Sequence, residues 1–545
     1  MIGVVCENSE MDVVREFFEL FKTPWEFYVE GRPYDVIVST LGDLPNCNAT
    51  VLVIYSSNKV HLDSVEGVVV GSQHSNVFVN NNGVKLPIYG SILSFEGVEH
   101  FLLSIMHNSE AAGFEIGSAQ RKILRVGYDL FKEVAFLLSK GQPIENANIP
   151  TLEIHISMLR TWIVNAGIPL VEVPPVPAGY NFIAGLTHDV DFVRIGNHKF
   201  DHTMWGFIYR ASFGSLSSVL KGRLSLGQLL RNLRAVFCLP LVFLGICKDF
   251  WFQFDRYREI EKDLKSTFFL IPFANKPGEK VSSPAAHRRA AKYDISDVAE
   301  TARHLTSLGY EVGVHGIDAW HNDKAGEQEL RRISEVVGKS KVGIRMHWLC
   351  INESSPKILE KAGYDYDSTF GYNKAVGYRA GTTQVYRPPG AMNLLELPLH
   401  VQDAALFSPG RLYLTEEEAW KLCEVMFNNV STYGGVLTIL WHLRSLAPER
   451  LWDDYYARLL EGLKTRGAWI TSAGQVVEWF RKRRALSFLN VCFTGNKLRL
   501  SLKYDGNAGD THLMLRVHLP VRGANAEGDT IDIPLTGDKE LEIAI

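Results

Sequence analysis

Residues 182–191 have the sequence Phe-Ile-Ala-Gly-Leu-Thr-His-Asp-Val-Asp, a short apolar run of strand type that ends in two aspartates. The same order of apolar run, polar residues and helical pattern recurs as far as residue 483. Strands that alternate with helices form parallel sheets, so this pattern predicts an α/β fold, a distorted (β/α)7–8 barrel. The expected strands cover residues 182–186, 267–271, 310–314, 342–344, 364–367, 394–397 and 436–441.

Outside this region the pattern changes, and a chain of 545 residues is long enough for about three domains. The proline-rich segment Val173–Gly179 indicates a stiff linker. We expect an N-terminal α/β accessory domain over residues 1–175, the barrel over residues 181–483 and a small all-β domain over residues 485–545. The last of these is expected to cap a sheet edge, with carbohydrate binding as the alternative.

The composition is that of a globular protein, and the formal net charge of −4 gives no indication of a nucleic-acid partner. Seven cysteines without a C-x-x-C motif favour a reducing compartment. The first residues, Met1-Ile-Gly-Val-Val-Cys-Glu, lack the basic and apolar regions of a secretory signal. We therefore expect a soluble, cytoplasmic protein.

An apolar insertion at residues 193–250 interrupts the barrel pattern and has the composition of a helical hairpin. Its strongest apolar run, Ala235 to Cys247, is too short to span a bilayer. Extra core or a dimer contact would explain the insertion. The alternatives are a hood over the site and a contact with a membrane surface, where a lipid-linked glycan could be held.

Ionisable residues follow the expected strands at their carboxyl ends, which is the edge where parallel barrels build active sites. These residues are Asp189, Asp191, His315, Arg345, Asp367 and His442.

Asp189 and Asp191 are two residues apart, so on an extended strand both carboxylates point to the same side. Turn or helix-cap aspartates are the alternative interpretation. His315 and His321 are too far apart for one helix face, and a loop must fold back to bring both imidazoles together. One aspartate and two histidines suit Zn²⁺ and leave positions open for water and substrate.

The remaining strand-end residues suggest acid–base pairs. Arg345 is expected to pair with Asp189 and keep it ionised. Asp367 is expected to pair with His442 and raise its pKa, which suits a general acid. A structural histidine bonded to a carbonyl group is the alternative for His442.

In order along the chain, five motifs resemble those of polysaccharide deacetylases, the NodB-homology fold of carbohydrate esterase family 4. They are Thr187-His-Asp-Val-Asp191, Val314-His315 with His321, Gly343-Ile-Arg345, Gly363-Tyr-Asp-Tyr-Asp367-Ser and Leu440-Trp-His442. The resemblance covers about residues 181–483 and implies a NodB-like barrel.

The resemblance also implies roles. Asp189 would be the general base, and Asp191, His315 and His321 would bind a divalent metal ion, with Zn²⁺ first and Ni²⁺ or Co²⁺ as alternatives. A water molecule activated by the metal would attack the acetamide carbonyl, with the backbone N–H near Met346 helping to stabilise the oxyanion. Arg345 would hold the base in place. Asp367 would tune His442, which would protonate the departing sugar amine.

Three departures from the family pattern leave alternatives open. Val190 separates the two aspartates, so Asp189 and Asp191 could exchange roles. The usual second histidine position is Ala319, which makes Asp318 a substitute for His321 as third ligand. Arg387-Pro-Pro-Gly390 also resembles the arginine motif, although Arg345 has the better position.

These observations predict a metal-dependent hydrolase of linear amides that removes the N-acetyl group from an amino sugar in a polysaccharide or glycan precursor. The alternatives are an amidohydrolase of a small non-sugar amide and a catalytically inactive glycan-binding relative. Candidate substrate contacts are Trp441, Arg379, Arg387 and Trp320.

Overall fold

The computed structural model of this chain divides into two compact units. Unit 1 comprises residues 1–179, 380–389 and 479–545, and unit 2 comprises residues 180–379 and 390–478. The structure describes residues 1–42, 49–118, 121–280, 286–494, 497–505, 512–520, 530–535 and 540–544.

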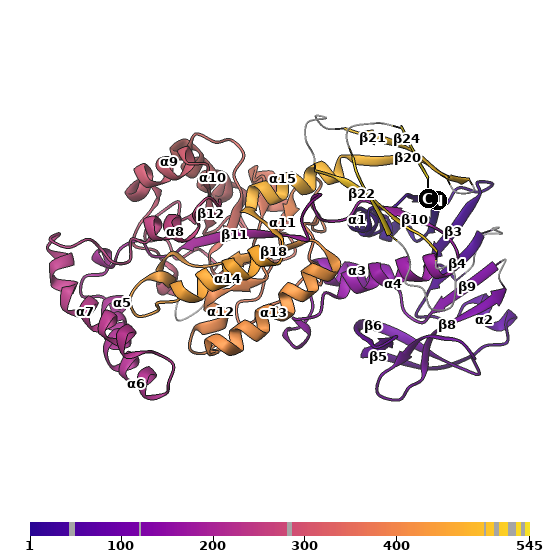
Figure 1. The fold of residues 1–545 in the computed structure, drawn as a ribbon, viewed down its shortest axis with the longest axis horizontal. Helices are drawn as coiled ribbons and strands as arrows, with labels where there is room; N and C mark the ends of the chain where they lie inside the picture. The colour runs from indigo at the N-terminus through magenta and orange to yellow at the C-terminus, as the bar shows by residue number, and fades with distance from the viewer. Residues whose placement is uncertain are drawn as a thin grey trace. The chain divides into compact units, whose positions relative to one another are not determined.

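Unit 2 is built on a parallel sheet with the order β16-β15-β14-β13-β12-β11-β18-β17, and β19 also pairs with β11 (Figure 1). Among the described residues β16 and β17 do not pair with each other, so the sheet is a parallel half-barrel. The strands are β11 (Phe182–Val190), β12 (Thr267–Leu270), β13 (Glu311–Gly316), β14 (Ile344–Met346), β15 (Tyr366–Asp367), β16 (Leu395–Glu396), β17 (Val401–Gln402), β18 (Val436–Leu440) and β19 (Ala468–Ser472).

Helices connect these strands, as a parallel sheet requires. α10 begins after Asn322, whose side chain accepts the Ala325 N–H, and ends at Gly338 with φ 68°. α13 begins with a capping box of Thr415 and Glu418. The helices are α8 (Phe254–Ile260), α9 (Ala299–Ser307), α10 (Asp323–Val337), α11 (Ser355–Ala362), α12 (Asp403–Phe407), α13 (Glu416–Tyr433), α14 (Asp453–Thr465) and α15 (Ala473–Arg484), which crosses from unit 2 into unit 1.

The insertion after β11 is helical, as the sequence predicts. It consists of α5 (His202–Tyr209), a π-helical turn η4 (Arg210–Gly214), α6 (Ser215–Leu220) and α7 (Leu226–Phe243). A small core of its own includes Met204, Phe207, Leu239 and Trp251. Among the described residues, α7 is the helix whose length and composition would allow it to cross a bilayer.

Unit 1 contains a mixed nine-stranded sheet with the order β2-β1-β3-β4-β9-β8-β6-β5-β7. The part from β2 to β9 is parallel and the remainder is antiparallel. Its strands are β1 (Ile2–Val5), β2 (Trp25–Phe27), β3 (Tyr34–Ser39), β4 (Ala49–Tyr55), β5 (Val69–Asn81), β6 (Val84–Glu96), β7 (Phe101–Ile105), β8 (Ala111–Ser118) and β9 (Arg121–Val126), and its helices are α1 (Met11–Phe21), α2 (His61–Val65), α3 (Leu130–Ser139) and α4 (Thr151–Asn165).

The C-terminal strands lie in unit 1, whereas the sequence suggests a separate domain at residues 485–545. The reason is strand pairing, because β10 (Leu170–Glu172) pairs antiparallel with β22 across the register Val171 to Val517. The described C-terminal strands are β20 (Leu486–Thr494), β21 (Lys497–Tyr504), β22 (Met514–His518), β23 (Thr530–Pro534) and β24 (Glu540–Ala544). They form two small sheets, β10-β22-β23 and β20-β21-β24.

Candidate active site

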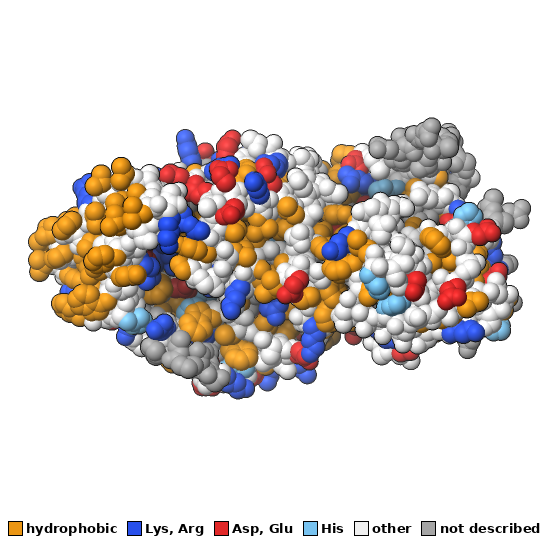
Figure 2. Space-filling model, turned by 90° about the horizontal axis from the view of Figure 1, so that it is seen from below, with side chains coloured by type: hydrophobic (Ala, Val, Ile, Leu, Met, Phe, Trp, Pro, Cys, Tyr) orange, Lys and Arg blue, Asp and Glu red, His pale blue; other side chains and the backbone are white. Residues whose placement is uncertain are grey.

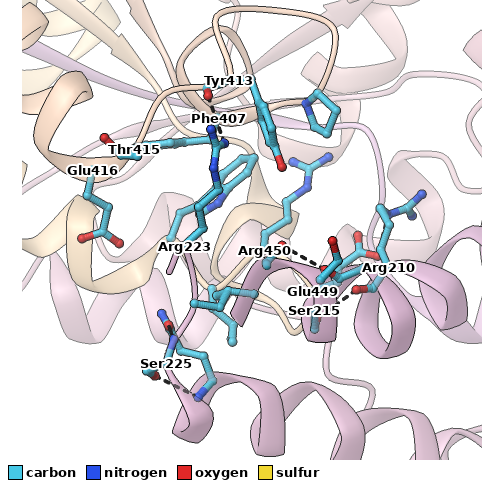
Figure 3. Close-up of a pocket in the computed structure, with 18 of the residues that line it drawn as sticks. Arg210, Ser215, Arg223, Ser225, Phe407, Tyr413, Thr415, Glu416, Glu449 and Arg450 are labelled. Atoms are coloured by element: carbon cyan, nitrogen blue, oxygen red, sulfur yellow. Dashed lines mark hydrogen bonds and ion pairs between the residues drawn. The ribbon is translucent and has the colours of Figure 1, made fainter. Parts of the chain in front are cut away.

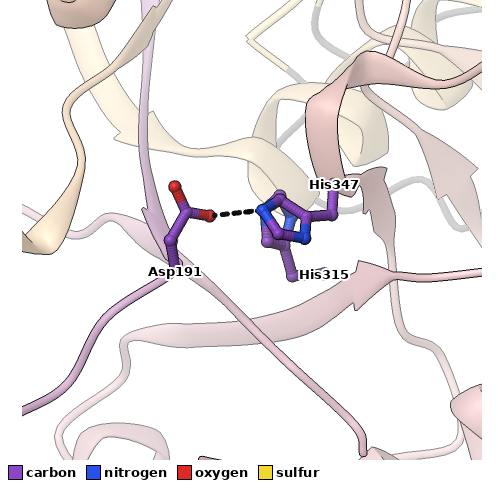
Figure 4. A group of neighbouring side chains, drawn as sticks. All are labelled: Asp191, His315 and His347. Carbon is purple, nitrogen blue, oxygen red and sulfur yellow. Dashed lines mark hydrogen bonds and ion pairs between the residues drawn. The ribbon is translucent and has the colours of Figure 1, made fainter. Parts of the chain in front are cut away.

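The carboxyl ends of β11, β13 and β14 bring three potential metal ligands together (Figure 4). Asp191 follows β11, His315 lies in β13 and His347 follows β14. One ligand atom from each residue lies within 4.8 Å of the other two. Among the described residues, this is the group of His, Cys, Asp or Glu side chains whose ligand atoms lie close enough together to hold one metal ion.

The hydrogen bonds of His315 show that this group suits a cation. Its Nδ1 lies 2.9 Å from the carbonyl oxygen of Arg345, so Nδ1 is the donor. In the neutral ring Nε2 then carries a lone pair, and it faces Asp191 Oδ1 at 3.1 Å. Two acceptors at this distance repel each other unless a proton or a metal ion lies between them, and an Nδ1–H bonded to a carbonyl is a common arrangement in metal-binding histidines.

The electrostatics of the other two ligands agree with this assignment. His347 Nε2 lies 3.3 Å from Asp191 Oδ1. Burial lowers the pKa of His347 to about 3, so its imidazole is neutral at neutral pH, the form that binds metals. Burial by itself would raise the pKa of Asp191, but the imidazoles of His347, His315 and His442 outweigh it and hold this pKa below its ordinary value.

Asp189 lies beside the three ligands and is held by Arg345. Arg345 Nη1 donates to Asp189 Oδ1 at 3.1 Å, the pair that the sequence predicts. The same guanidinium donates to Thr187 and to the carbonyl and hydroxyl groups of Ser368, and it is fully buried. These bonds fix the orientation of the Arg345 guanidinium beside the Asp189 carboxylate.

His442 lines the same cavity, but its carboxylate partner differs from the prediction. His442 Nδ1 lies 2.6 Å from Asp403 Oδ1, and the backbone N–H of His442 donates to Asp403 Oδ2 at 2.7 Å. Burial would lower the pKa of His442, but the carboxylates of Asp403 and Asp191 outweigh it and raise this pKa. His442 Nε2 faces the site at 3.7 Å from Asp191 Oδ2.

The predicted pair of Asp367 with His442 is wrong. Asp367 Oδ1 accepts the hydroxyl of Thr369, and burial raises the pKa of Asp367 to about 6. Burial and Asp367 raise the pKa of the neighbouring Glu396 well above its usual value. Asp367 is a buried structural carboxyl group in β15, whereas Asp403, directly after β17, occupies the place beside His442.

The third ligand position also differs from the prediction. His321 lies outside the group of three, and its Nε2 is 3.2 Å from Asp318 Oδ1. Asp318 Oδ1 also accepts the N–H of Glu279, so this carboxylate is used within its own loop. The loop after β13 does not bring His321 to this group, and His347 is the third potential ligand instead.

The cavity at the site has a volume of about 190 Å³. It is lined by Asp189, Asp191, His315, His347, Trp348, Leu349, Asn373, Gln402, Ala404, Ser408, Arg411, Leu440, His442 and Arg450. His347 could have been found by the rule that identified Asp189 and Asp191, because it follows Arg345 by two residues at a strand end.

The four candidate substrate contacts are not among these lining residues. Trp441 is fully buried and stacks on Tyr455 with a centroid distance of 5.9 Å. Arg379 donates to the carbonyl of Gly371, and the Trp320 ring lies against His321. Arg387 belongs to unit 1, where its backbone N–H donates to Glu16.

The backbone N–H of Met346 is also occupied, since it donates to Thr369 Oγ1 at 3.0 Å. It therefore does not point freely into the site as an oxyanion donor.

Arg289 ties together the loops that carry two of the ligands. Its buried guanidinium donates to the carbonyl of Ile317 at 2.8 Å, after β13, and to the carbonyl of His347 at 3.0 Å, after β14. The next two residues, Trp348 and Leu349, have φ values of 66° and 52°, an uncommon conformation for side chains of this size. The turn after β14 is thus held in one unusual shape.

The fold and the site together define a parallel half-barrel with three potential metal ligands at the carboxyl ends of its strands. The chain is similar in structure to a putative polysaccharide deacetylase from Mycobacterium smegmatis, at 20% identity and a TM-score of 0.34 over 56% of this chain and 93% of that one. It is also similar to PuuE allantoinase, at 11% identity and a TM-score of 0.35 over 56% and 92% of the two chains. A family 4 acetyl xylan esterase from Clostridium thermocellum matches at 15% identity and a TM-score of 0.22 over 41% and 81%.

No protein-family model matches this chain, and no curated protein sequence matches it.

Proposed function

We propose that this protein is a metal-dependent deacetylase that hydrolyses the N-acetyl group of an amino sugar in a polysaccharide or glycan precursor. The observation that carries the proposal is the grouping of Asp191, His315 and His347 within 4.8 Å, flanked by Asp189 and His442 in one cavity. The motifs shared with polysaccharide deacetylases support the amino-sugar substrate.

Asp191, His315 and His347 would hold a divalent ion, with Zn²⁺ as the first candidate and Ni²⁺ or Co²⁺ as alternatives. Such an ion would supply Lewis acidity and lower the pKa of water. Asp189, paired with Arg345 at 3.1 Å, accepts the proton of the attacking water molecule. His442, oriented by Asp403 at 2.6 Å, donates a proton to the amine nitrogen as the C–N bond breaks. Acetate and a free amino sugar leave the site.

The two aspartates have distinguishable roles, and this gives the test. Full-length protein is loaded with Zn²⁺, and acetate release from N-acetylglucosamine oligomers is measured together with bound metal. The Asp191→Asn variant should lose the metal. The Asp189→Asn variant should keep it and release acetate about 10²- to 10⁴-fold more slowly, the range that proton transfer contributes.

The other outcomes contradict the proposal in defined ways. Acetate release equal to wild type in the Asp189→Asn variant would remove Asp189 as the base. Metal loss in Asp189→Asn rather than Asp191→Asn would exchange the two roles. If wild-type protein binds metal but releases acetate only from small non-sugar amides, the substrate is a non-sugar amide. If it binds no metal, the protein is an inactive relative.

A further inference from the structure

The insertion after β11 exposes an unusual number of large apolar side chains. Figure 2 shows hydrophobic side chains gathered at the end of unit 2 where Figure 1 places α5, α6 and α7. We call this surface the apolar hairpin face; its large exposed members are Phe200, Trp205, Tyr209, Phe213, Leu216, Leu220, Leu226, Leu230, Phe237, Leu241, Leu244 and Ile246. Leu220 is 81% exposed and Phe237 is 79% exposed.

Helix α7 is apolar on two opposite faces. One face, with Ala235, Leu239 and Val242, is buried against the small core of the insertion. The other face carries the exposed Leu226, Leu230, Phe237, Leu241 and Leu244, which follow helical spacing. A contiguous exposed apolar face on a helix is typical of a surface that contacts a partner or a membrane, so this second face is a candidate contact surface.

The charge of the insertion indicates what this cover is. Residues 193–250 contain eight Lys or Arg and two Asp, with no Glu. Both aspartates are used by the backbone, Asp201 at the start of α5 and Asp249 by the N–H groups of Ile195 and Gly196. Lys221, Arg234 and Lys248 are exposed. Aromatic and aliphatic side chains among exposed cations are typical of surfaces that bind anionic lipid.

We propose that the apolar hairpin face docks on the surface of an anionic phospholipid bilayer. Arg210 and Arg231 pair with Glu449 and Asp453, which leaves Lys221, Arg234 and Lys248 as exposed cations of the insertion. A second copy of the chain fits less well, because two such faces would bring these like charges together. The hairpin lies in the interface and does not span the bilayer. The 18 residues of α7 extend about 27 Å, short of the roughly 30 Å hydrocarbon core, and they include Arg231, Arg234 and Pro240.

The docked hairpin also lies beside a cavity of about 1310 Å³ in unit 2 (Figure 3). Tyr209, Arg210 and Phe213 of the insertion form part of its wall. Ser408 and Arg450 line both this cavity and the smaller one at the metal-type group. Docking therefore places a bilayer next to a cavity that adjoins the candidate active site.

Vesicle co-sedimentation with the full-length protein tests the proposal. Wild-type protein should sediment with vesicles of phosphatidylcholine and phosphatidylglycerol at about 0.1 M salt and much less with phosphatidylcholine alone, and added salt should weaken binding because it screens the charges. The double variant Leu220→Gln/Phe237→Gln should bind these vesicles at least about tenfold more weakly. Lys221→Ala/Arg234→Ala should lose most of the preference for the anionic lipid.

Met392→Gln is the matched control, since Met392 is an apolar side chain of unit 2 that is 77% exposed outside the hairpin. It should bind vesicles like wild type. Circular dichroism and thermal midpoints equal to wild type would show that the variants fold. Equal vesicle binding by wild type and Leu220→Gln/Phe237→Gln would overturn the proposal, as would no binding by wild type. Light scattering gives a third outcome: if wild type forms a dimer that the same double variant dissociates, and neither binds vesicles, the face would be assigned to a second copy. If the protein stays in membranes after an alkaline carbonate wash, the interfacial position would be overturned.

Discussion

His347 and His321 differ in the environment that the structure gives them, although both follow strands of the same sheet. His347 Nε2 faces Asp191 at 3.3 Å, whereas His321 Nε2 faces Asp318 at 3.2 Å in its own loop. We expect His347→Gln to weaken Zn²⁺ binding by at least about 100-fold, since loss of even an outer hydrogen-bonding partner costs about 10- to 100-fold. His321→Gln should bind Zn²⁺ like wild type in equilibrium dialysis. The opposite order of the two affinities would restore His321 as the third ligand.

Asp403 is the second residue whose place in the site comes from the coordinates, which pair it with His442. It accepts both the ring N–H and the backbone N–H of His442, so it fixes which nitrogen of His442 faces the site. Asp403→Asn should lower kcat for acetate release by about 10²- to 10⁴-fold with KM nearly unchanged, because only proton donation is lost. Asp367→Asn is the control and should lower kcat far less. A larger loss in Asp367→Asn would return that residue to the role that the sequence suggested.

At the scale of elements, helix α10 is joined to the loop after β13 by a buried carboxyl group. Glu329 accepts the N–H groups of Ile317 and Asp318 at 2.9 and 2.8 Å, and burial raises its pKa to about 7. A carboxyl group whose pKa is raised on folding stabilises the native state below its unfolded pKa and loses this contribution as the pH rises through the folded value.

As the pH rises from 5.5 to 8, ionisation of Glu329 should lower the free energy of unfolding of wild-type protein by about 2 kcal/mol. The Glu329→Gln variant cannot ionise there, so the stability difference between wild type and Glu329→Gln should shrink by this amount as the pH rises. Urea unfolding at the two pH values measures it, with the exposed Glu335→Gln on the same helix as control. A difference that stays constant with pH would show that Glu329 does not titrate in this range.

Local turns also separate elements that the periodicity of the sequence joins. Apolar residues recur at helical spacing across residues 122–139, but the structure has β9, a turn and then α3 there. Asp129 caps α3 by accepting the N–H groups of Phe131 and Lys132. A side chain at Gly127 would place its Cβ 2.3 Å from the carbonyl oxygen of Leu93, so glycine permits a close approach of two chain segments there.

At the scale of the whole molecule, a short segment from the middle of the barrel sequence belongs to unit 1. Residues 380–389 include the buried Val385 and Tyr386. Glu153 of α4 accepts the N–H of Thr383 at 2.9 Å and the side-chain amide of Gln384 at 3.1 Å. The boundary that the sequence suggests, residues 181–483, therefore removes partners that this segment needs.

We expect the isolated fragment 181–483 to be recovered mainly as insoluble protein, because it leaves these buried side chains without most of their cover. The same fragment with residues 380–389 replaced by a Gly/Ser linker should be more soluble. Soluble yield and size-exclusion profiles measure the difference. A soluble, monomeric fragment 181–483 with its native segment would contradict the assignment of residues 380–389 to unit 1.

The sequence by itself determined the parallel α/β character of unit 2 and the edge at which its polar residues gather. Both follow from periodicity, since apolar runs form strands and parallel strands end at one edge. By this rule Asp189, Asp191, His315, Arg345 and His442 could be identified, because each lies in a strand or directly after it.

Only the tertiary structure decided which loop residues complete the site. His347 rather than His321 faces Asp191, and Asp403 rather than Asp367 faces His442. Loops have no periodicity, and their shapes depend on long-range contacts such as the bonds from Arg289 to carbonyls about 28 and 58 residues away. The sheet of β22 and β23 lies in unit 1 for the same reason, since β10, the partner of β22, lies more than 300 residues earlier in the chain.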